Sequence, residues 1–475
     1  MNIIGEILLS LYFITVLVTI CVIIFENRSP VRALAWVTVL IVVPAVGLVL
    51  YIVFGRNIRS KKLLKRSQKR KLKTHSSGKQ LSFQRSNLSE ESHSLIRLAS
   101  ALGSAPAQVE NDISLFNEGK NKFKSLLEDI SRAEKYIYIQ YYIIADDHTG
   151  NQLCDLLINK VSEGVKVTMV YDPVGSFPTK KKFFKRLIAA GINAKPFIPV
   201  RFPAMGIKVN WRNHRKLCVI DGIVGYIGGM NVADRYLTGG DNFEMWRDMH
   251  LRVTGPVVAS LEASFIADWN FIDNDMERFL ENTPLSPGSL KKGNVIAQLI
   301  SSGPTSLWYS IELLFLKAIS LAKNRVYIAT PYFLPTEGLL SALQSAALSR
   351  VDVRIMVPDH SDSKLLTYAT ASYVKECLRS GIKFYFFQPG MLHSKMLLID
   401  DEITSIGSTN FDFRSFEHNF EANLFVYSRE FNRLAADMYY EDIKKSKRIM
   451  ASEWNKRSLN RKVCESFTRL FAPIL

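Results

Sequence analysis

The sequence predicts an α/β protein in which two duplicated α/β domains with pseudo-twofold symmetry follow an α-helical transmembrane hairpin. Three observations support this fold class. Two long apolar runs stand near the amino terminus, the order of helices and strands repeats after about 180 to 190 residues, and each repeat carries the same polar motif. A period of this length indicates a duplicated domain, and alternating helices and strands are typical of a mostly parallel sheet.

The first apolar run, residues 7–25, holds 19 uncharged positions. A helix of that length spans about 28 Å, close to the ~30 Å hydrocarbon core of a bilayer. The uncharged residues 33–55 form a second run, in which we expect Pro44 to kink the helix. The alternative is a cleavable signal peptide, but no Lys or Arg precedes the run and a second run follows at once. We therefore expect a transmembrane hairpin over residues 1–57.

A strongly basic segment follows the hairpin. Ten of the 18 residues from Arg56 to Lys73 are Lys or Arg, and none is acidic. The positive-inside rule places this segment, and the domains after it, on the cytoplasmic side of the membrane. It carries +10 of the net charge of +17 (61 basic minus 44 acidic residues). Nucleic acid is the rival partner, but the adjacent span favours anionic lipid headgroups. We interpret residues 58–105 as this basic segment and a linker with one short helix.

The soluble part divides into a first domain, residues 106–290, and a second, residues 291–475. In the first domain the periodicity predicts helices at 123–130, at 152–162 and ending near 191, and strands at 136–142, 165–172 and 217–220. In the second it predicts helices that begin near 314 and end near 381, and strands at 326–332, 351–359 and 396–399. The five scattered cysteines form no CxxC pair, which argues against a disulfide scaffold or a cysteine-rich zinc site.

Each domain contains His-x-Lys-x4-Asp, six further residues, and then Gly-(Gly/Ser)-x-Asn. The first copy is His214, Lys216, Asp221, Gly228, Gly229 and Asn231; the second is His393, Lys395, Asp400, Gly407, Ser408 and Asn410. Residues i and i+2 of a strand share a face, so each histidine and its lysine project together. The two aspartates stand at the far end of the strand, and we expect them to fix the following turn.

Two His–Lys pairs suit chemistry on a phosphodiester. The lysines supply ammonium donors, and Asn231, Asn410 and Ser408 supply neutral donors for phosphate oxygens. One imidazole can attack phosphorus while the other protonates the departing alkoxide. Each histidine then needs a carboxylate on its far nitrogen, and we assign Asp248 and Glu421 to this role. The alternative for these two acids is a salt bridge at a strand edge. A zinc site is disfavoured because each motif offers one ligand.

The twin motifs resemble those of the phospholipase D superfamily. The leading spans, the segments 212–216, 246–248 and 268–269, and Thr330-Pro331-Tyr332-Phe333-Leu334-Pro335 narrow this resemblance to bacterial phospholipase D-type cardiolipin synthases. It implies two phospholipase D-like domains that share one active site in the bacterial cytoplasmic membrane. It also implies that two phosphatidylglycerols yield cardiolipin and glycerol through a phosphatidyl-histidine, without a metal or other cofactor. The catalytic residues carried over are His214, Lys216, Asp221, His393, Lys395 and Asp400, with His214 as nucleophile and His393 as general acid.

Several alternatives stay open on sequence alone. A hydrolytic phospholipase D or a phosphatidylserine synthase shares the chemistry and differs in its acceptor. A membrane-tethered nuclease needs a basic groove with stacking aromatics, which the sequence does not show, so we expect no nucleic-acid partner. A non-catalytic scaffold would be expected to have lost a histidine or lysine of the motifs. The oligomeric state, a homo-oligomer included, is open. Residues 444–475 either lie in the membrane interface or pack on the second domain.

Overall fold

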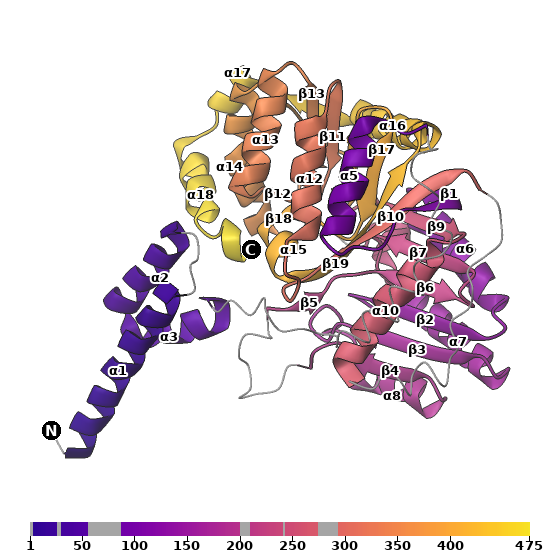
Figure 1. Ribbon diagram of the computed structural model, residues 1–475, viewed down its shortest axis with the longest axis horizontal. Coiled ribbons are helices and arrows are strands. Elements are labelled where there is room, and N and C mark those ends of the chain that lie inside the picture. The colour runs from indigo at the N-terminus through magenta and orange to yellow at the C-terminus, as the bar shows by residue number, and fades with distance from the viewer. Residues whose placement is uncertain (1–2, 26–29, 56–86, 200–209, 241–242, 274–292) are drawn as a thin grey trace. The chain divides into compact units, whose positions relative to one another are not determined.

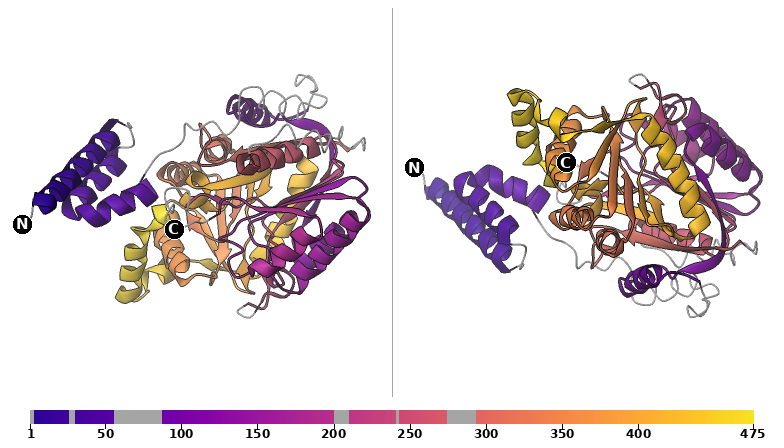
Figure 2. Two further views of the ribbon diagram at one scale, coloured as in Figure 1. Left: turned by 90° about the horizontal axis from the view of Figure 1, so that it is seen from below. Right: turned by 90° about the horizontal axis from the view of Figure 1, so that it is seen from above.

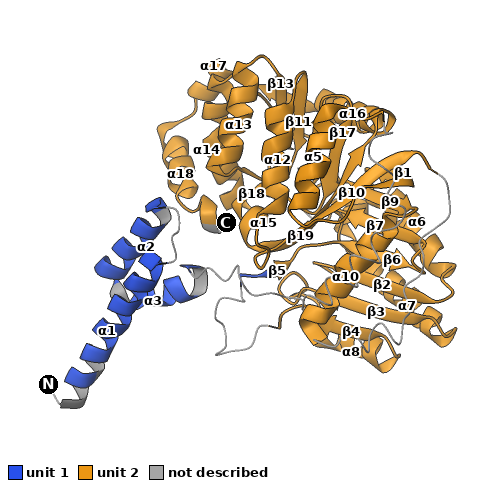
Figure 3. Cartoon of the chain, in the orientation of Figure 1, with its two compact units in different colours: residues 1–61, 200–211 blue, residues 62–199, 212–475 orange. Residues whose placement is uncertain are grey.

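The computed structural model describes residues 3–25, 30–55, 87–199, 210–240, 243–273 and 293–475. The chain forms two compact units: residues 1–61 with 200–211, and residues 62–199 with 212–475 (Figure 3). The basic segment from Arg56 to Lys73 and the expected domain boundary between residues 290 and 291 lie outside the described residues.

The described part of the first unit is helical. Its elements are α1 (Ile3–Phe25), α2 (Pro30–Val42), α3 (Pro44–Leu50) and the π-helix η1 (Tyr51–Gly55). The expected kink lies between α2 and α3, where Val43 leaves the helical conformation with φ −134° and Pro44 begins the next helix. Proline lacks the amide hydrogen that a continuing helix needs, so it starts a helix more readily than it extends one.

Among the described residues, no helix is both long and apolar enough to cross a bilayer. The transmembrane hairpin stays a prediction.

The second unit is built on one 16-stranded sheet with the order β20-β14-β13-β11-β16-β17-β19-β10-β1-β9-β7-β6-β2-β3-β4, and β5 pairs with β19 beside this path. Strands before residue 291 are β1 (Gln108–Phe116), β2 (Tyr136–Tyr141), β3 (Lys166–Tyr171), β4 (Asn193–Pro196), β5 (Arg212–Asn213), β6 (Leu217–Ile220), β7 (Val224–Gly228), β8 (Trp246–Arg247) and β9 (His250–Thr254). Strands after it are β10 (Val295–Ser302), β11 (Arg325–Ala329), β12 (Phe333–Leu334), β13 (Asp352–Pro358), β14 (Lys383–Phe387), β15 (Met391–Leu392), β16 (Met396–Ile399), β17 (Ile403–Gly407), β18 (Phe411–Asp412), β19 (Asn419–Tyr427) and β20 (Ser446–Ile449).

The strand order repeats about the centre of the sheet. Outward from the central pair, β1-β9-β7-β6-β2-β3-β4 on one side corresponds to β10-β19-β17-β16-β11-β13-β14 on the other. The central strands β1 and β10 run antiparallel, with Gln108 opposite Ala297. We call the residues before and after position 291 the first and second halves. The halves are therefore joined edge to edge in one sheet.

The expectation of a mostly parallel sheet is wrong. In each half, parallel pairing occurs where helices connect the strands, as in β2, β3 and β4 or β11, β13 and β14. Apart from β5, which runs parallel beside β19, the remaining pairs of the main sheet are antiparallel, among them β6 with β7 and β16 with β17. These strands follow each other through short turns, and a short turn reverses the chain, whereas a parallel neighbour needs a long crossover.

Helices cover both faces of this sheet (Figures 1 and 2). In the first half they are α6 (Gly119–Ser131), α7 (His148–Ser162), α8 (Lys181–Ala189), α9 (Arg235–Thr238) and α10 (Val258–Asp273). In the second they are α12 (Ser310–Leu321), α13 (Glu337–Leu348), α14 (Lys364–Arg379), α15 (Phe413–Glu417), α16 (Arg429–Lys444), α17 (Ala451–Asn455) and α18 (Leu459–Arg469). Equivalent helices occupy equivalent places: α10 packs on β2, β6 and β7, as α16 packs on β14, β16, β17 and β19.

Within its described residues the expected linker contains one helix, α5 (Glu90–Ala101), and this helix packs against the second half. It packs on α12, and Leu95, Ile96 and Ala99 are buried in the apolar core of that half. The N-cap Ser89 donates its backbone N–H to the Glu402 carboxylate at 2.9 Å. The chain thus contacts the second half before it builds the first.

Candidate active site

The motif histidines and lysines lie between a two-residue strand, β5 or β15, and a longer strand of the main sheet, β6 or β16. In the first half, His214 and Lys216 stand between β5 and β6; in the second, His393 and Lys395 stand between β15 and β16. They precede the strands β6 and β16 and do not belong to them. Each lysine still folds back on its histidine, and the Lys216 ammonium donates to the His214 carbonyl oxygen at 2.6 Å.

Each motif pairs with the opposite half of the chain. Strand β5 runs beside the start of β19, and β15 runs beside β8. The His214 amide donates to the Phe420 carbonyl at 2.9 Å, and the His393 amide donates to the Arg247 carbonyl at 2.7 Å. These backbone contacts place each histidine beside the residue that follows the accepting carbonyl, which is Glu421 within β19 for the first and Asp248 after β8 for the second.

The carboxylates are therefore exchanged between the halves. His214 Nδ1 lies 2.9 Å from Glu421 Oε1, and His393 Nδ1 lies 2.7 Å from Asp248 Oδ2. A carboxylate on Nδ1 holds the proton there and leaves Nε2 free to act on a substrate. The geometry is that of the histidine-orienting role that we expected for these two acids, but each acid serves the histidine of the other half.

Burial determines the protonation of this centre. His214 and His393 are 8% and 7% exposed, and the two lysines and two acids are buried more deeply. Burial lowers the pKa of His214 to about 4, although the nearby Glu421 charge opposes the shift, and it lowers the pKa of His393 well below its ordinary value. Both imidazoles are thus neutral near pH 7.

The lysines and acids respond to the same burial. It lowers the pKa of Lys395 to about 8 and that of Lys216 well below its ordinary value, while the facing carboxylates act in the opposite direction. Burial raises the pKa of Asp248 to about 6. It also acts to raise the pKa of Glu421, but the interactions with His214, Lys216 and Ser408 together outweigh it and the pKa is lowered. The negative charge of a bound phosphate would raise the pKa of the two lysines and so favour their charged form.

The difference between Gly229 and Ser408 has a structural reason. The Ser408 hydroxyl donates to Glu421 and accepts from the Ala422 amide at 3.0 Å, so it holds the carboxylate that serves His214. At Gly229 a Cβ atom would collide with the Asp248 carboxylate. Asp248 instead accepts the Met249 amide at 2.7 Å. Phosphate binding by Ser408 stays a prediction, and within the described residues its hydroxyl supports Glu421.

The two motif asparagines have partners within the protein. Asn231 donates to the Tyr236 hydroxyl at 2.6 Å and accepts the Ile143 amide at 3.1 Å. The Asn410 side chain interacts with Asp412, and its oxygen has no hydrogen-bond partner among the described residues. Phosphate binding by these amides stays a prediction.

Asp221 and Asp400 lie away from the histidines, at the far ends of β6 and β16. Asp221 has φ 54° and accepts three backbone amides, those of residues 134–136, at 2.8 Å each. Asp400, with φ 46°, accepts the amides of residues 323–325 in the same way. Each aspartate thus ties the turn after its strand, β6 or β16, to the start of the neighbouring strand in the sheet, β2 or β11. We assign these two motif residues to the fold of each half, although the resemblance groups them with the catalytic residues.

The sequence interpretation missed a buried lysine behind the first motif. Lys122 on α6 is fully buried, donates to the Tyr141 hydroxyl at 3.0 Å and lies 3.8 Å from the centre of the Phe123 ring. Burial lowers its pKa to about 7. The sequence offered one signal that this lysine is buried. Lys122, Leu126 and Asp129 recur at helical spacing and so share the buried face of α6.

The sequence interpretation also missed the role of a buried ion pair, Arg215 with Asp268, that supports the backbone of the first motif. Arg215, between the motif histidine and lysine, pairs with the buried Asp268 at 2.5 Å and donates to the Glu421 carbonyl at 3.1 Å. Asp268 also accepts from Asn213 at 3.0 Å. The intervening residue of the motif therefore fixes the backbone on which His214 and Glu421 sit.

Comparisons with known proteins agree with this geometry. The family model described as cardiolipin synthase, PLD-like domain, matches residues 126–269 and 315–443, and the phospholipase D-nuclease N-terminal model matches residues 13–56. The chain is 39% identical to the cardiolipin synthase of Alkalihalophilus pseudofirmus, over 96% of this chain and 91% of that protein. It is also 39% identical to the major cardiolipin synthase ClsA of Bacillus subtilis, over 99% of this chain and all of that protein.

The fold is also that of a solved structure, the phosphatidylserine synthase of Haemophilus influenzae, which aligns with a TM-score of 0.61 at 15% identity over 80% of this chain and 98% of that one. At that identity the likeness concerns the fold alone. Family models that together match more than half of the residues, and relatives aligned over nearly the whole length, settle the family. The chain belongs to the cardiolipin synthases of the phospholipase D superfamily.

Proposed function

We propose that the two-histidine centre joins two phosphatidylglycerol molecules into cardiolipin and releases glycerol. The observation that carries this proposal is the single buried centre in which His214 and His393 each bind a carboxylate of the opposite half. Such a centre has one neutral nucleophile and one acid–base group, which is what a two-step transfer requires. Lys216 and Lys395 would neutralise the phosphate oxygens of the substrate and of the transition state.

In the first step, His214 Nε2 attacks phosphorus and the bond to the glycerol headgroup breaks. His393 gives a proton to the departing glycerol oxygen. In the second step, a hydroxyl of another phosphatidylglycerol attacks the phosphatidyl-histidine, the P–N bond breaks, and His393 takes the hydroxyl proton back. The first step needs a protonated His393, whose pKa is low in the free protein. The negative charge of a bound phosphodiester would raise it.

Lipid mass spectrometry on purified protein with phosphatidylglycerol as the sole lipid tests this function. Cardiolipin and glycerol in equal amounts are expected. Phosphatidic acid and glycerol without cardiolipin would indicate that water is the acceptor, and the protein would then be a hydrolase. Addition of serine tests the remaining acceptor, since a phosphatidylserine synthase would make phosphatidylserine in preference to cardiolipin. His214→Ala and His393→Ala proteins should form no product in either case.

We further propose that α18 lies in the lipid interface of the bacterial cytoplasmic membrane, together with a multi-pass amino-terminal anchor. The helix buries Glu465 and Thr468 against the second half and exposes apolar residues, with Val463 58% and Phe467 60% exposed. Arg469 pairs with Glu376 on α14 at 2.7 Å and so holds this orientation. An apolar face turned outward with basic neighbours is typical of an interfacial helix.

The interface proposal is tested by replacing Val463 and Phe467 with serine. Activity on phosphatidylglycerol vesicles should fall several-fold, while activity on short-chain substrate in detergent should stay unchanged. Leu434→Ser on α16, another exposed apolar residue, is the matched control. Removal of residues 1–73 should likewise impair only the vesicle reaction. Equal loss in both assays would contradict a membrane role for either segment.

A further inference from the structure

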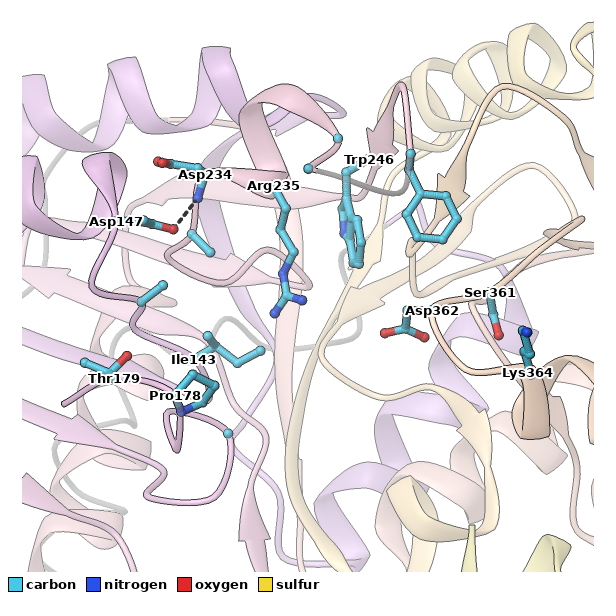
Figure 4. A pocket seen from close by; sticks show the side chains of 16 residues that line it. Ile143, Asp147, Pro178, Thr179, Asp234, Arg235, Trp246, Ser361, Asp362 and Lys364 are labelled. Carbon is cyan, nitrogen blue, oxygen red and sulfur yellow. Dashed lines mark hydrogen bonds between the residues drawn. The ribbon is translucent and has the colours of Figure 1, made fainter.

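A cavity of about 690 Å³ lies beside His393, within the size range of small-molecule sites. Both halves line it: Asp147, Arg235 and Trp246 come from the first, and Ser361, Asp362 and Lys364 come from the second (Figure 4). The Trp246 ring lies 5.4 Å from the His393 ring, centre to centre. The Asp362 charge also acts to raise the pKa of His393, although burial dominates that pKa. The cavity is thus next to the histidine to which we assign acid–base chemistry.

Arg235 is the cation of this cavity. It begins α9, four residues after Asn231, and its guanidinium extends into the cavity (Figure 4). The guanidinium carbon lies 5.2 Å from the Trp246 ring centre. Its Nε atom is buried without a hydrogen-bond partner, and no carboxylate pairs with this arginine within the described ranges. An unpaired guanidinium with a buried N–H is arranged to receive an anion, and its planar fork fits a phosphate in particular.

The opposite wall offers acceptors for hydroxyl groups. One oxygen of Asp362 accepts from the Tyr332 hydroxyl at 2.6 Å, which fixes the carboxylate at the cavity. The second oxygen of the carboxylate can accept further hydrogen bonds. Ser361 and Lys364 line the same part of the cavity as Asp362. One cavity therefore combines a phosphate-binding cation with a hydroxyl-binding carboxylate, next to a proton carrier.

We infer that this cavity binds the acceptor phosphatidylglycerol, with Arg235 on its phosphate and Asp362 on its glycerol hydroxyls. The inference rests on the proposed function and assigns selection of the acceptor lipid to Arg235. In the second step the acceptor hydroxyl oxygen forms a bond to phosphorus, the bond from phosphorus to His214 breaks, and the proton passes to His393. Free glycerol and water carry no phosphate. They lack the contact with Arg235, which favours the lipid acceptor over both.

Exposed apolar residues adjoin the lining residues along the chain. Phe177, 83% exposed, lies between the lining residues Gly175 and Pro178, and Leu365, 44% exposed, directly follows Lys364. Exposed apolar side chains adjacent to a polar cavity can contact acyl chains while the headgroup enters. The two side chains belong to opposite halves, as the charged groups inside the cavity do.

The test compares two reactions of the same full-length protein. Cardiolipin formation from phosphatidylglycerol needs an acceptor with a phosphate, whereas exchange of labelled free glycerol into phosphatidylglycerol does not. In Arg235→Ala, kcat/KM for cardiolipin formation should fall about 10- to 100-fold, the scale of one charge-assisted hydrogen bond. Glycerol exchange should stay within about threefold of wild type and reports that the variant is folded. Arg235→Lys should recover part of the loss, and Arg433→Ala on α16 is the matched surface control.

A second measurement uses soluble acceptors. Wild type should prefer glycerol phosphate to glycerol, and Arg235→Ala should lose this preference. Equal loss of cardiolipin formation and glycerol exchange, or loss of neither, would overturn the inference. So would a selective loss in Arg414→Ala, the equivalent position four residues after Asn410, with none in Arg235→Ala. A wild-type protein that makes phosphatidic acid and no cardiolipin would instead refute the proposed function, which the inference presupposes.

Discussion

Exchange of the carboxylates between the halves leads to a specific prediction for Glu421→Gln and Asp248→Asn. Both acids are fully buried, and each lies within 3 Å of one histidine Nδ1. An amide of the same shape can donate a hydrogen bond to Nδ1, which then moves the ring proton to Nε2. In Glu421→Gln this would block Nε2 of the nucleophile His214, and in Asp248→Asn it would affect the acid–base His393.

The expected magnitude follows from the geometry. The equivalent change behind the histidine of a serine-protease triad lowers kcat about 10⁴-fold. The His214–Glu421 contact is likewise a buried hydrogen bond to Nδ1, at 2.9 Å, so we expect each variant to lose roughly 10²- to 10⁴-fold in cardiolipin formation. Because overall turnover would fall in both, the rate of cardiolipin synthesis does not distinguish the two roles.

Formation of the covalent intermediate does distinguish them. An activated phosphatidyl ester with a good leaving group needs no general acid, so Asp248→Asn should still form the adduct on His214 at a rate near that of wild type. Glu421→Gln should form it at least 100-fold more slowly. Quenched samples analysed by peptide mass spectrometry give both rates, and Asp437→Asn on the surface of α16 serves as the matched control.

Two outcomes would refute this reasoning. Slow adduct formation in Asp248→Asn with normal formation in Glu421→Gln would mean that the nucleophile is His393 or that the acids serve their own halves. The site of the adduct separates these cases, because adduct on His393 reverses the roles while adduct on His214 leaves only the pairing wrong. Equal adduct rates in both variants would show that neither acid controls the nucleophile.

Three further predictions concern groups around the centre. The pKa of Lys395 is lowered to about 8 by burial, so its charge is lost as pH rises through 8 and kcat/KM should fall there; Lys395→Arg should move this alkaline limb upward in a pH–rate profile, and an unchanged limb would exclude Lys395 as its cause. Burial lowers the pKa of Lys122 to about 7 in the folded protein, so between pH 7 and its ordinary pKa the unfolded state binds more protons. The unfolding free energy of wild type, measured by chemical denaturation relative to Lys122→Met, should therefore rise by up to about 1.4 kcal/mol per pH unit above pH 7. Asp221→Ala should lower the unfolding free energy by about 2–4 kcal/mol through loss of its three amide contacts, with little change in activity per folded molecule; an intact protein that has lost its activity would place this residue in the chemistry.

The local pattern of the sequence predicted most of the individual elements. The strands around residues 136–142, 165–172 and 396–399 lie within a residue or two of the expected bounds. The directions of the strands in the sheet were not predictable from these patterns, because alternating apolar residues fix which face is buried and not the direction of a neighbour. Direction was decided by connection length, and the short turns after β6 and β16 make those pairs antiparallel.

The sequence by itself singled out the candidate residues for the chemistry, because the motif repeats and the spacing of its members along the chain is a local property. It could not assign each acid to a histidine: Asp248 follows His214 by 34 residues and Glu421 follows His393 by 28, which is equally compatible with pairing within a half. Only the tertiary structure decided that His214 meets Glu421, 207 positions away, because edge-to-edge joining of the halves brings β5 beside β19. The cavity with Arg235 and Asp362 likewise exists only where the two halves meet, since its opposite walls come from distant parts of the chain.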